Sequence, residues 1–318
     1  MIDFLFSPAS TETHLIAPDK LPGSVSAYQQ DLQTGVVELN FGDRSVYHLL
    51  FARGQLVNIY HHGEEIERLN SDAWFQSMQS ERHSAHVRAL ALTPQAVRLV
   101  KILLEQERVD MQPLPQGVSL EQQFETWIKN PGPALAHIRW PNAEALALIP
   151  GQDAPPLYTL FISANQILHS AGGMQALYGW QEFPVLVSFL RSETHTRAWE
   201  EYLLYYSFSQ MTTHLLERFS DLIGLMLVNT IIREINFTAA AHGWNISLSG
   251  TSVTDQMIFS SPTEAARVYS QLLETLFNQA EALLGADLLG GLVRESAQRL
   301  IAPCRTAMQE YNLIIPPG

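Results

Sequence analysis

The sequence predicts an α+β protein in which two duplicated small antiparallel-sheet-plus-helix units precede a mainly helical domain with one β-hairpin. The first observation is a repeated pattern, because YHLLFARGQLV at residues 47–57 returns as YTLFISANQIL at residues 158–168. The second is that the elements expected around both stretches follow one order: a helix, three strands, a helix and a strand. The third is a change at Thr194, after which long helical patterns dominate. These observations predict a first α+β unit with its connecting helix, a second α+β unit and a helical domain, over residues 1–107, 108–193 and 194–318.

The first unit is outlined by turn residues and by alternating apolar positions. Thr34-Gly35 is expected to end its first helix, because glycine adopts the left-handed conformation that is common just after helix C-termini. Val37 and Leu39 alternate along one face of the first strand, and Gly54 centres the hairpin between the second and third strands. In chain order we expect a helix over residues 24–33, strands over 36–41, 46–52 and 55–61, a helix within 63–79 and a strand over 85–92.

The second unit repeats this order with one addition. Ser119 and Gln122 have the spacing of a capping box at the start of its first helix, which Gly132 is expected to end. Asn165 stands where Gly54 stands in the first hairpin, and asparagine is a residue that can share the left-handed conformation of glycine. We expect a helix over residues 118–130, strands over 133–140, 157–163 and 166–170, a helix over 172–180, a strand over 183–190, an inserted segment with one more strand over 142–156, and a connecting helix over 94–106.

The C-terminal domain is expected to be a helix bundle. One predicted helix covers residues 196–208, and a second runs on to Gly243 without a proline. The apolar positions of the second helix form a face broader than a coiled-coil seam, which is typical of a packed bundle helix. Ser261 and Glu264 predict a capping box with Pro262 at the first helical position. The hairpin is expected over residues 244–250 and 255–261, and the remaining helices over 261–285 and 288–302, with a break at Pro303.

The first unit resembles the PATAN domain, the N-terminal module of PatA-type bacterial response regulators. The resemblance is carried by LQTGVVELNF at residues 32–41, VYHLLFARGQLVNIYHHGEE at 46–65 and DAWFQSM at 72–78. The family typically shows a helix that ends in a Thr-Gly pair, an apolar–aromatic strand, a glycine-centred hairpin and a short final strand. The second unit is similar to it in order but has Pro131-Gly132 in place of the Thr-Gly pair. The resemblance implies a non-catalytic interaction module in a signalling or regulatory setting.

Composition argues against several classes of partner. The chain of 318 residues carries 32 acidic and 19 basic residues, which gives a net charge of −13, and it has no cluster of Lys or Arg. We therefore expect no nucleic-acid and no membrane partner, since nucleic acids and anionic lipid surfaces are bound through basic patches. No apolar run approaches the roughly 20 residues that a membrane span needs, and the first residues lack the basic cluster of a signal peptide. With Cys304 as the single cysteine, no intrachain disulfide can form, and we expect a cytoplasmic protein.

No catalytic, cofactor or metal site is expected, and the chain is not predicted to be an enzyme. His61 and His62 are neighbours on a predicted strand, so their side chains point to opposite faces and do not readily share one ion. Glu64 and Glu65, which follow them, favour a helix start through the helix dipole. Cys304 has no nearby histidine to activate it, and we expect an inert, partly buried thiol.

The functional expectation concerns surfaces. Aromatic side chains gather before the long helix, and such side chains are typical interface anchors. We expect a regulatory or adaptor protein of bacterial signalling that acts through protein–protein contacts, with an unknown protein partner and a possible homodimer. The alternative is a small-ligand sensor with an apolar pocket in the helical domain. The residues assigned to partner or dimer contact are Trp199, Tyr202, Tyr206, Phe208, Leu215 and Phe219, and the turn residues of the repeats are Gly35, Gly54, Gly132 and Asn165.

Overall fold

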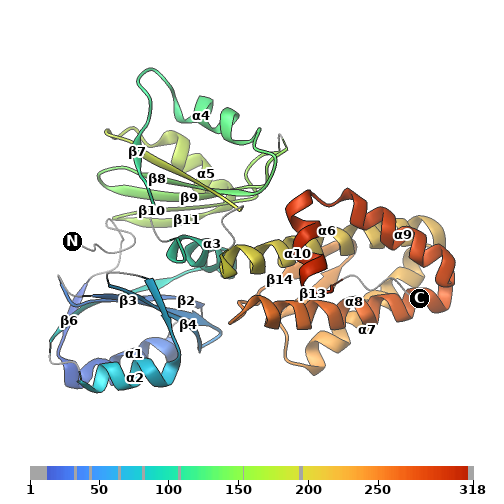
Figure 1. Cartoon of the computed structure of the whole chain (residues 1–318), viewed down its shortest axis with the longest axis horizontal. Helices are drawn as coiled ribbons and strands as arrows, with labels where there is room; N and C mark the ends of the chain where they lie inside the picture. The colour runs from blue at the N-terminus through green and yellow to red at the C-terminus, as the bar shows by residue number, and fades with distance from the viewer. Residues whose placement is uncertain are drawn as a thin grey trace. The chain divides into compact units, whose positions relative to one another are not determined.

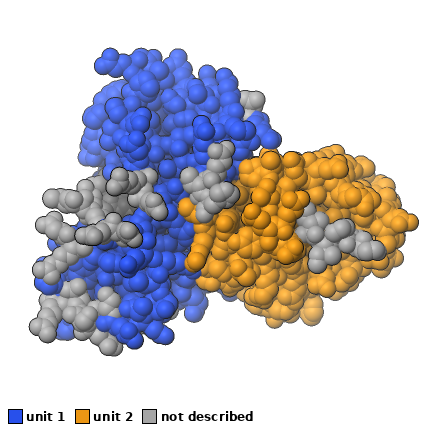
Figure 2. All heavy atoms as spheres, in the orientation of Figure 1, with its two compact units in different colours: residues 1–194 blue, residues 195–318 orange. Residues whose placement is uncertain are grey.

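The computed structural model describes residues 13–31, 34–42, 45–63, 66–80, 83–106, 109–152, 154–192 and 196–313. The chain separates into two compact units, Met1–Thr194 (unit 1) and His195–Gly318 (unit 2), coloured in Figure 2. Unit 1 holds two six-stranded antiparallel sheets, and unit 2 holds helices and one two-stranded hairpin. The predicted α+β class is therefore confirmed.

The first sheet has the strand order β1-β6-β2-β3-β4-β5, with antiparallel pairing throughout. Its strands are β1 (His14–Ile16), β2 (Thr34–Asn40), β3 (Val46–Ala52), β4 (Gln55–His62), β5 (Ile66–Leu69) and β6 (Ala85–Ala91). The other elements of this half are the 3-10 helix η1 (Pro18–Lys20) and the helices α1 (Leu21–Asp31) and α2 (Ser71–Ser80). Leu21 of α1 and Trp74 of α2 are fully buried and share one cluster with Val37 and Leu39, so both helices cover the same face of the sheet.

The second sheet has the strand order β7-β12-β8-β9-β10-β11 and is also antiparallel. Its strands are β7 (Gln112–Pro113), β8 (Ala134–Arg139), β9 (Ala143–Ile149), β10 (Tyr158–Ser163), β11 (Gln166–His169) and β12 (Leu186–Arg191). Its helices are α4 (Leu120–Trp127), which begins with the predicted capping box of Ser119 and Gln122, and α5 (Ser170–Gly179). Phe124 and Leu177 anchor these two helices on the face that carries Ile138 and Phe161.

The two halves of unit 1 have the same topology. Each runs strand, helix, four strands, helix and strand, and each places its last strand between the first strand and the second. Strands β1 to β6 therefore correspond in order to β7 to β12. The predicted duplication of a small sheet-plus-helix unit agrees with this arrangement.

The repeated sequence pattern does not align with the repeated topology. Residues 47–57 cover β3 and the start of β4, whereas residues 158–168 cover β10 and β11, which correspond to β4 and β5. The segment over 142–156, which the pattern makes an insertion, contains β9, and β9 is the counterpart of β3. The sequence did not predict β1, β5 and β7, and it assigned the residues of β5 to a helix start. Adjacent antiparallel hairpins have similar apolar spacing. The sequence pattern of the β3–β4 hairpin therefore matches the β10–β11 hairpin, although the structural counterpart of β3–β4 is β9–β10.

The helix α3 (Pro94–Leu104) connects the two halves, as predicted, and lies between their sheets (Figure 1). It contacts β2 on one side and β10 on the other. Every residue from Ala96 to Leu104 is buried. Each sheet therefore has α3 on one face and its own pair of helices, α1 and α2 or α4 and α5, on the other. The central strands are buried on both faces.

The hairpin turn at Gly54 is confirmed, but its counterpart differs. Arg53 has φ +51° and Gly54 has φ +70°, the pair of positive values that a two-residue type I′ turn requires. Asn165 is not among the described residues with positive φ, so the prediction that it copies glycine is wrong. Ser163 pairs directly with Gln166 across that turn without a left-handed residue.

Gly35 and Gly132 do not end helices. Gly35 lies inside β2, where a Cβ atom would sit 2.1 Å from the carbonyl oxygen of Leu90 on β6. Glycine is required there because two strands approach closely. The helix α4 ends at Trp127, well before Gly132, whose carbonyl accepts a hydrogen bond from Asn130 Nδ2 at 2.6 Å. Both predicted helix stops are therefore wrong.

Unit 2 is a helical bundle with one hairpin. A single cluster of buried side chains joins its helices, among them Leu215 of α6, Ile231 of α7, Leu272 of α8 and Val293 of α9. Ser261 caps α8 by accepting from Glu264 N at 3.2 Å, as predicted, whereas the Glu264 carboxylate accepts from Ser260 N at 2.8 Å, one residue before the expected Ser261. The elements are α6 (Arg197–Ile223), α7 (Leu225–Ala241), β13 (Ile246–Ser249), β14 (Ser252–Asp255), α8 (Pro262–Leu284), α9 (Ala286–Arg299) and α10 (Ala302–Glu310).

Two boundaries in unit 2 differ from prediction, and the predicted break at Pro303 is present. The long helix is broken at Gly224, which has φ +81° and ψ 156° and separates α6 from α7. The second hairpin strand ends at Asp255, where it was expected to begin, because the polar SVTD segment pairs with β13 and the more apolar DQMIFSS segment does not. Pro303 does interrupt the last predicted helix, and a further helix, α10, begins there.

Candidate functional site

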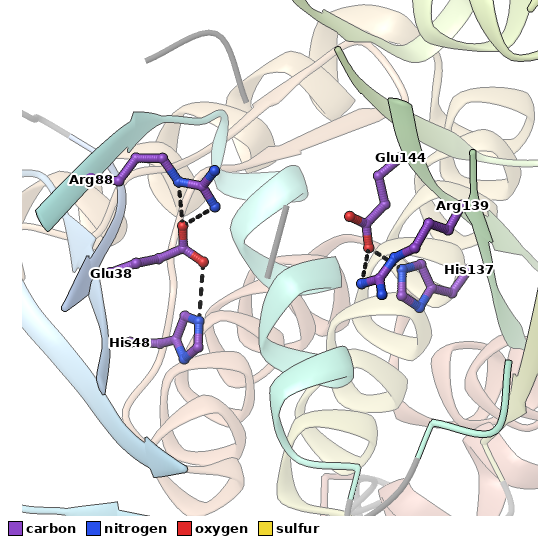
Figure 3. Close-up of polar contacts among 6 residues, drawn as sticks. All are labelled: Glu38, His48, Arg88, His137, Arg139 and Glu144. Atoms are coloured by element: carbon purple, nitrogen blue, oxygen red, sulfur yellow. Dashed lines mark hydrogen bonds and ion pairs between the residues drawn. The ribbon is translucent and has the colours of Figure 1, made fainter. Parts of the chain in front are cut away.

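A buried carboxylate lies between an imidazole and a guanidinium on the interior face of the first sheet. Glu38 of β2 lies opposite His48 of β3 and opposite Arg88 of β6 in the strand register. Its Oε1 is 3.1 Å from His48 Nε2, and its Oε2 accepts from Arg88 Nε at 2.6 Å. Glu38 is fully buried, and the two partners are nearly so. We call these residues the first charged cluster (Figure 3).

The second sheet carries a cluster of the same chemistry. Glu144 of β9 is fully buried, and its Oε1 accepts from Arg139 at 3.0 Å and contacts His137 Nε2. Arg139 and His137 both come from β8. We call these residues the second charged cluster. Figure 3 shows the two clusters on either side of the α3 ribbon.

Both clusters use the equivalent strand pairs β2–β3 and β8–β9, but their residues take different positions, and the arginine of the first cluster comes from β6. The amide of Leu92 donates to Thr34 O, and the amide of Ser192 donates to Pro133 O, so these two contacts superpose the registers of β2 and β8. This register places His137 at the position of Glu38. The acid is therefore on the second strand in one half and on the third strand in the other. Acid, imidazole and guanidinium recur without residue-by-residue equivalence.

The electrostatics of the first cluster favour an ionised carboxylate. Burial by itself raises the pKa of Glu38, but the hydrogen bond and charge of His48 and the charge of Arg88 overcome it and lower the pKa overall. The neighbouring ring of His62 lies 4.8 Å from that of His48. Burial, together with the charges of His48 and His61, lowers the pKa of His62 to about 3.

These clusters fit a structural role better than a catalytic one. A general acid or base must reach a substrate, and Glu38 and Glu144 are both fully buried. Their hydrogen-bond partners lie on the neighbouring strands, so the ion pairs fix strand register next to α3. The helix also carries buried basic residues, Arg98 and Lys101. Sequence reasoning missed both clusters, and the available signal was a charged residue in the middle of an apolar strand.

The two tyrosines of the repeated pattern have different surroundings. Tyr47 stacks on His61, with ring centroids 4.5 Å apart, on the face covered by α1 and α2. The hydroxyl of Tyr158 contacts Thr93, which caps α3, and His169 Nδ1 at 2.8 Å. The contacts of the two tyrosines differ, so the repeated pattern marks the fold and no shared chemistry.

A surface groove lies beside β12 in the second half of unit 1. Its volume is about 450 Å³. The rings of Trp127 and Phe189 stack face to face within its wall, with centroids 5.4 Å apart. The residues that line it come from β12, from α4 and from the segment around β7: Asp110, Gln112, Pro113, Pro115, Gln123, Trp127, Val187, Ser188, Phe189 and Leu190.

The groove follows a partly open strand edge. The short strand β7 pairs only with Leu186 and Val187 of β12. Leu114 N donates to Val185 O at 2.8 Å, which shows that odd-numbered residues of this segment direct their backbone groups toward β7. The next such residue, Phe189, lies beyond the pairing and lines the groove. An edge of this kind can accept the backbone of another strand.

The predicted contact residues on α6 are largely interior. Phe208, Leu215 and Phe219 belong to the core of unit 2, and Phe208 stacks on Tyr269 with centroids 4.7 Å apart. Trp199 and Tyr202 are also buried, and Tyr206 is partly buried. In this structure the aromatic cluster does not form an open surface. The broad apolar face signalled packing within the chain.

Other reactive side chains do not assemble into a site. Among the residues described, no group of three or more His, Cys, Asp or Glu is placed to hold a metal ion, and Glu64 and Glu65 lie outside the described residues. Burial raises the pKa of the Cys304 thiol to about 11, which fits the expected inert cysteine. His214 Nδ1 lies 2.7 Å from Ser296 Oγ, but that hydroxyl donates to Leu292 O and is 1% exposed.

The comparisons with known proteins add no relative. A scan against protein-family models and searches of curated proteins and of solved structures find no match to this chain. Within the described residues, no helix combines the length and apolarity needed to cross a lipid bilayer. The class of protein is thus defined by architecture: a duplicated antiparallel α+β unit joined to a helical unit, with buried charge clusters and a grooved strand edge.

Proposed function

We propose that this chain is a non-catalytic regulatory or adaptor protein, and that the groove beside β12 binds an extended segment of a protein partner. The observation that carries the proposal is the coincidence of a groove of about 450 Å³ with the open edge of β12. The PATAN resemblance of the first unit supports a setting in bacterial signalling. The single cysteine supports action in the cytoplasm.

The groove offers both backbone and side-chain recognition. Beyond Val187, the N–H and C=O groups of Phe189 point to the open edge, where an added strand would pair with them. Trp127 and Phe189 supply an apolar wall, and Pro113 and Pro115 line the groove near them. The exposed Asp110 favours a basic residue in the partner. We expect a bound segment with alternating apolar side chains and one Lys or Arg.

Strand addition is tested most directly at Phe189, because its amide points away from β8. Phe189→Pro removes the edge-facing N–H and leaves the hydrogen bonds to β8 intact, and proline is tolerated at such edge positions. Phe189→Ala is the matched control, since it removes the same ring but keeps the amide. Full-length wild type and both variants would be used to capture proteins from a bacterial lysate, with quantitative mass spectrometry.

The expected result is one or more partners bound by wild type, retained in part by Phe189→Ala and lost with Phe189→Pro. A synthetic peptide covering the bound segment should then compete with the partner. Capture that is equal for wild type and Phe189→Pro would remove the groove from the proposal. The alternative, a small-ligand sensor with a pocket in unit 2, stays a prediction.

A further inference from the structure

Helix α7 presents large apolar side chains to solvent. Met226 is 85% exposed, Phe237 is 71% exposed and Leu225 is 64% exposed. Leu222, at the end of α6, is 47% exposed. Single exposed apolar residues are common, but a group of this size along one short helix is typical of an interaction surface.

Met226 and Phe237 lie on one stripe along the outer face of α7. The opposite face is the core side, where Val228, Ile231, Ile235 and Ala239 are buried. At 3.6 residues per turn, positions separated by four and three residues stay on one side of a helix. The outer stripe therefore contains Met226, Thr230, Arg233 and Phe237.

The order of residue types along this stripe is nearly symmetric about its midpoint. Its two ends are large and apolar, Met226 and Phe237, and its centre is polar, with Arg233 donating to Thr230 Oγ1 at 3.2 Å. A twofold interface requires a surface that is complementary to itself, so that residue i contacts residue j of the copy and j contacts i. The midpoint of the stripe falls between Ile231 and Ile232.

We propose that this stripe is a homodimer interface, in which α7 packs antiparallel against α7 of a second copy across a twofold axis near Ile231 and Ile232. Met226 then lies against Phe237 of the second copy, and the reverse contact forms at the other end. Thr230 lies opposite Arg233 of the second copy. Leu225 and Leu222 flank the apolar ends and extend the buried area.

The charges of α7 suit this arrangement. Arg233 and Glu234 are its charged residues. Under the same symmetry, Glu234 of one copy lies beside Asn229 of the other, about one helical turn from Arg233. Each Arg233 can therefore reach Glu234 of the second copy, which gives two reciprocal pairs. A stripe for an unrelated partner would not need this matching about its own centre, and for this reason we assign it to a second copy.

The oligomeric state of the full chain tests the inference, and sedimentation over a range of protein concentrations measures it. Wild type is expected to dimerise. Met226→Glu and Phe237→Glu are each expected to raise the dimer dissociation constant by about a hundredfold or more, because a symmetric interface loses every contact twice. Leu288→Glu is the matched control, since Leu288 is a 45% exposed leucine on α9 of the same unit, and its dimer should be unchanged.

Cysteine pairs test the antiparallel geometry without relying on a destabilising variant. Positions 226 and 237 are separated by 11 residues, which is about 16 Å along the helix. Met226→Cys mixed with Phe237→Cys should form an intermolecular disulfide, whereas either variant alone should not. The native Cys304 is fully buried and should not react.

Three results would overturn the inference. The first is a wild-type monomer at every concentration, and the second is a dimer that survives Met226→Glu and Phe237→Glu. The third is self-linking of Met226→Cys alone, which would indicate parallel helices. The groove beside β12 lies in unit 1, so Phe189→Pro should leave dimerisation unchanged, and the two proposals can fail separately.

Discussion

Arg88 Nε donates to Glu38 Oε2 at 2.6 Å from the position directly opposite on the neighbouring strand. This contact joins β6 to β2, whose positions in the sequence are far apart, at a point where both side chains are almost completely buried. His48 completes the cluster from the other neighbouring strand. The ion pair therefore specifies which strands are neighbours and in which register.

Removing the carboxylate charge should strongly destabilise unit 1. Glu38→Gln keeps the shape of the side chain but removes the carboxylate charge that the buried Arg88 guanidinium contacts, and breaking a buried ion pair in this way costs about 3–5 kcal/mol. Urea unfolding followed by tryptophan fluorescence measures the loss. Glu67→Gln is the control, because the Glu67 side chain is largely exposed and its contact with His61 is long, at 3.7 Å. Its free energy of unfolding should change by less than about 0.5 kcal/mol.

Replacing both charges by apolar side chains should be less harmful than replacing one. The double variant Glu38→Leu with Arg88→Met removes the desolvation cost of both ions, so its free energy of unfolding should exceed that of either single variant. If the double variant is less stable than both singles, the ion pair contributes more than burial of apolar groups could replace.

Stability should fall as the pH falls below about 6.5, and His62 should be one cause. Because the pKa of His62 in the folded chain is lowered to about 3, the unfolded chain binds a proton at His62 over this range and the folded chain does not. The stability that depends on a neutral His62 is fully present above the pKa of His62 in the unfolded chain. Between neutral pH and about pH 5 the loss from His62 alone is about 2 kcal/mol.

A variant isolates this contribution. His62→Asn cannot titrate, so its unfolding free energy should depend less on pH than that of wild type between pH 7 and pH 5. The lowered pKa of Glu38 acts in a different window, because that contribution is present above the unfolded carboxylate pKa and is lost as the pH falls through the folded value. Equal pH dependence of wild type and His62→Asn would exclude His62 as the cause.

The α+β class of unit 1 was predictable from the sequence, but its strand order and the alignment of its repeats were not. Val37 and Leu39 alternate as a strand should, and Gly54 marks a hairpin that the structure contains. The same alternation occurs in every strand of an antiparallel sheet. YTLFISANQIL therefore matched the sequence of β3–β4, although it forms β10–β11. Only the strand order, which depends on contacts far apart in the chain, distinguishes neighbouring hairpins.

The charged clusters were not predictable for a related reason. Glu38 alternates with Val37 and Leu39, so a sheet with one buried face would place it in solvent. The helix α3 lies over that second face, and no local spacing indicates this. Phe208 and Leu215 show the opposite case: they were expected at an interface with another chain, and they are buried in the core of unit 2. A broad apolar stripe does not reveal whether its partner is in the same chain.

A methyl group at Gly35 should separate two strands. The Cβ of Gly35→Ala would lie 2.1 Å from Leu90 O, a contact that only movement of β2 away from β6 can relieve. We expect a loss of about 1–3 kcal/mol, in the range for overpacking of an interior. Gly23→Ala is the control in α1, because its Cβ would have no neighbour within 4 Å and alanine favours the helix. Denaturant midpoints of the two variants should therefore shift in opposite directions.

The two glycines that break the helices of unit 2 should be the least replaceable residues of their junctions. Gly224 and Gly285 share φ +81° and ψ 156°, a region that only glycine occupies without strain. Gly224→Ala and Gly285→Ala should each lower the free energy of unfolding by about 1–3 kcal/mol. Gly291→Ala within α9 is the control, since its Cβ meets nothing within 4 Å and should leave stability equal or higher.

The strain at Gly224 can also be relieved by a change of shape, which gives the measurement a second readout. If the junction straightens, α6 and α7 become one helix, far-UV ellipticity rises and the packing that places Leu215 and Ile231 in one buried cluster is lost. The variants should be compared in a Met226→Glu background, so that self-association through α7 does not enter. Unchanged unfolding midpoints together with unchanged ellipticity would contradict the assignment, because alanine would then tolerate a conformation that its Cβ opposes.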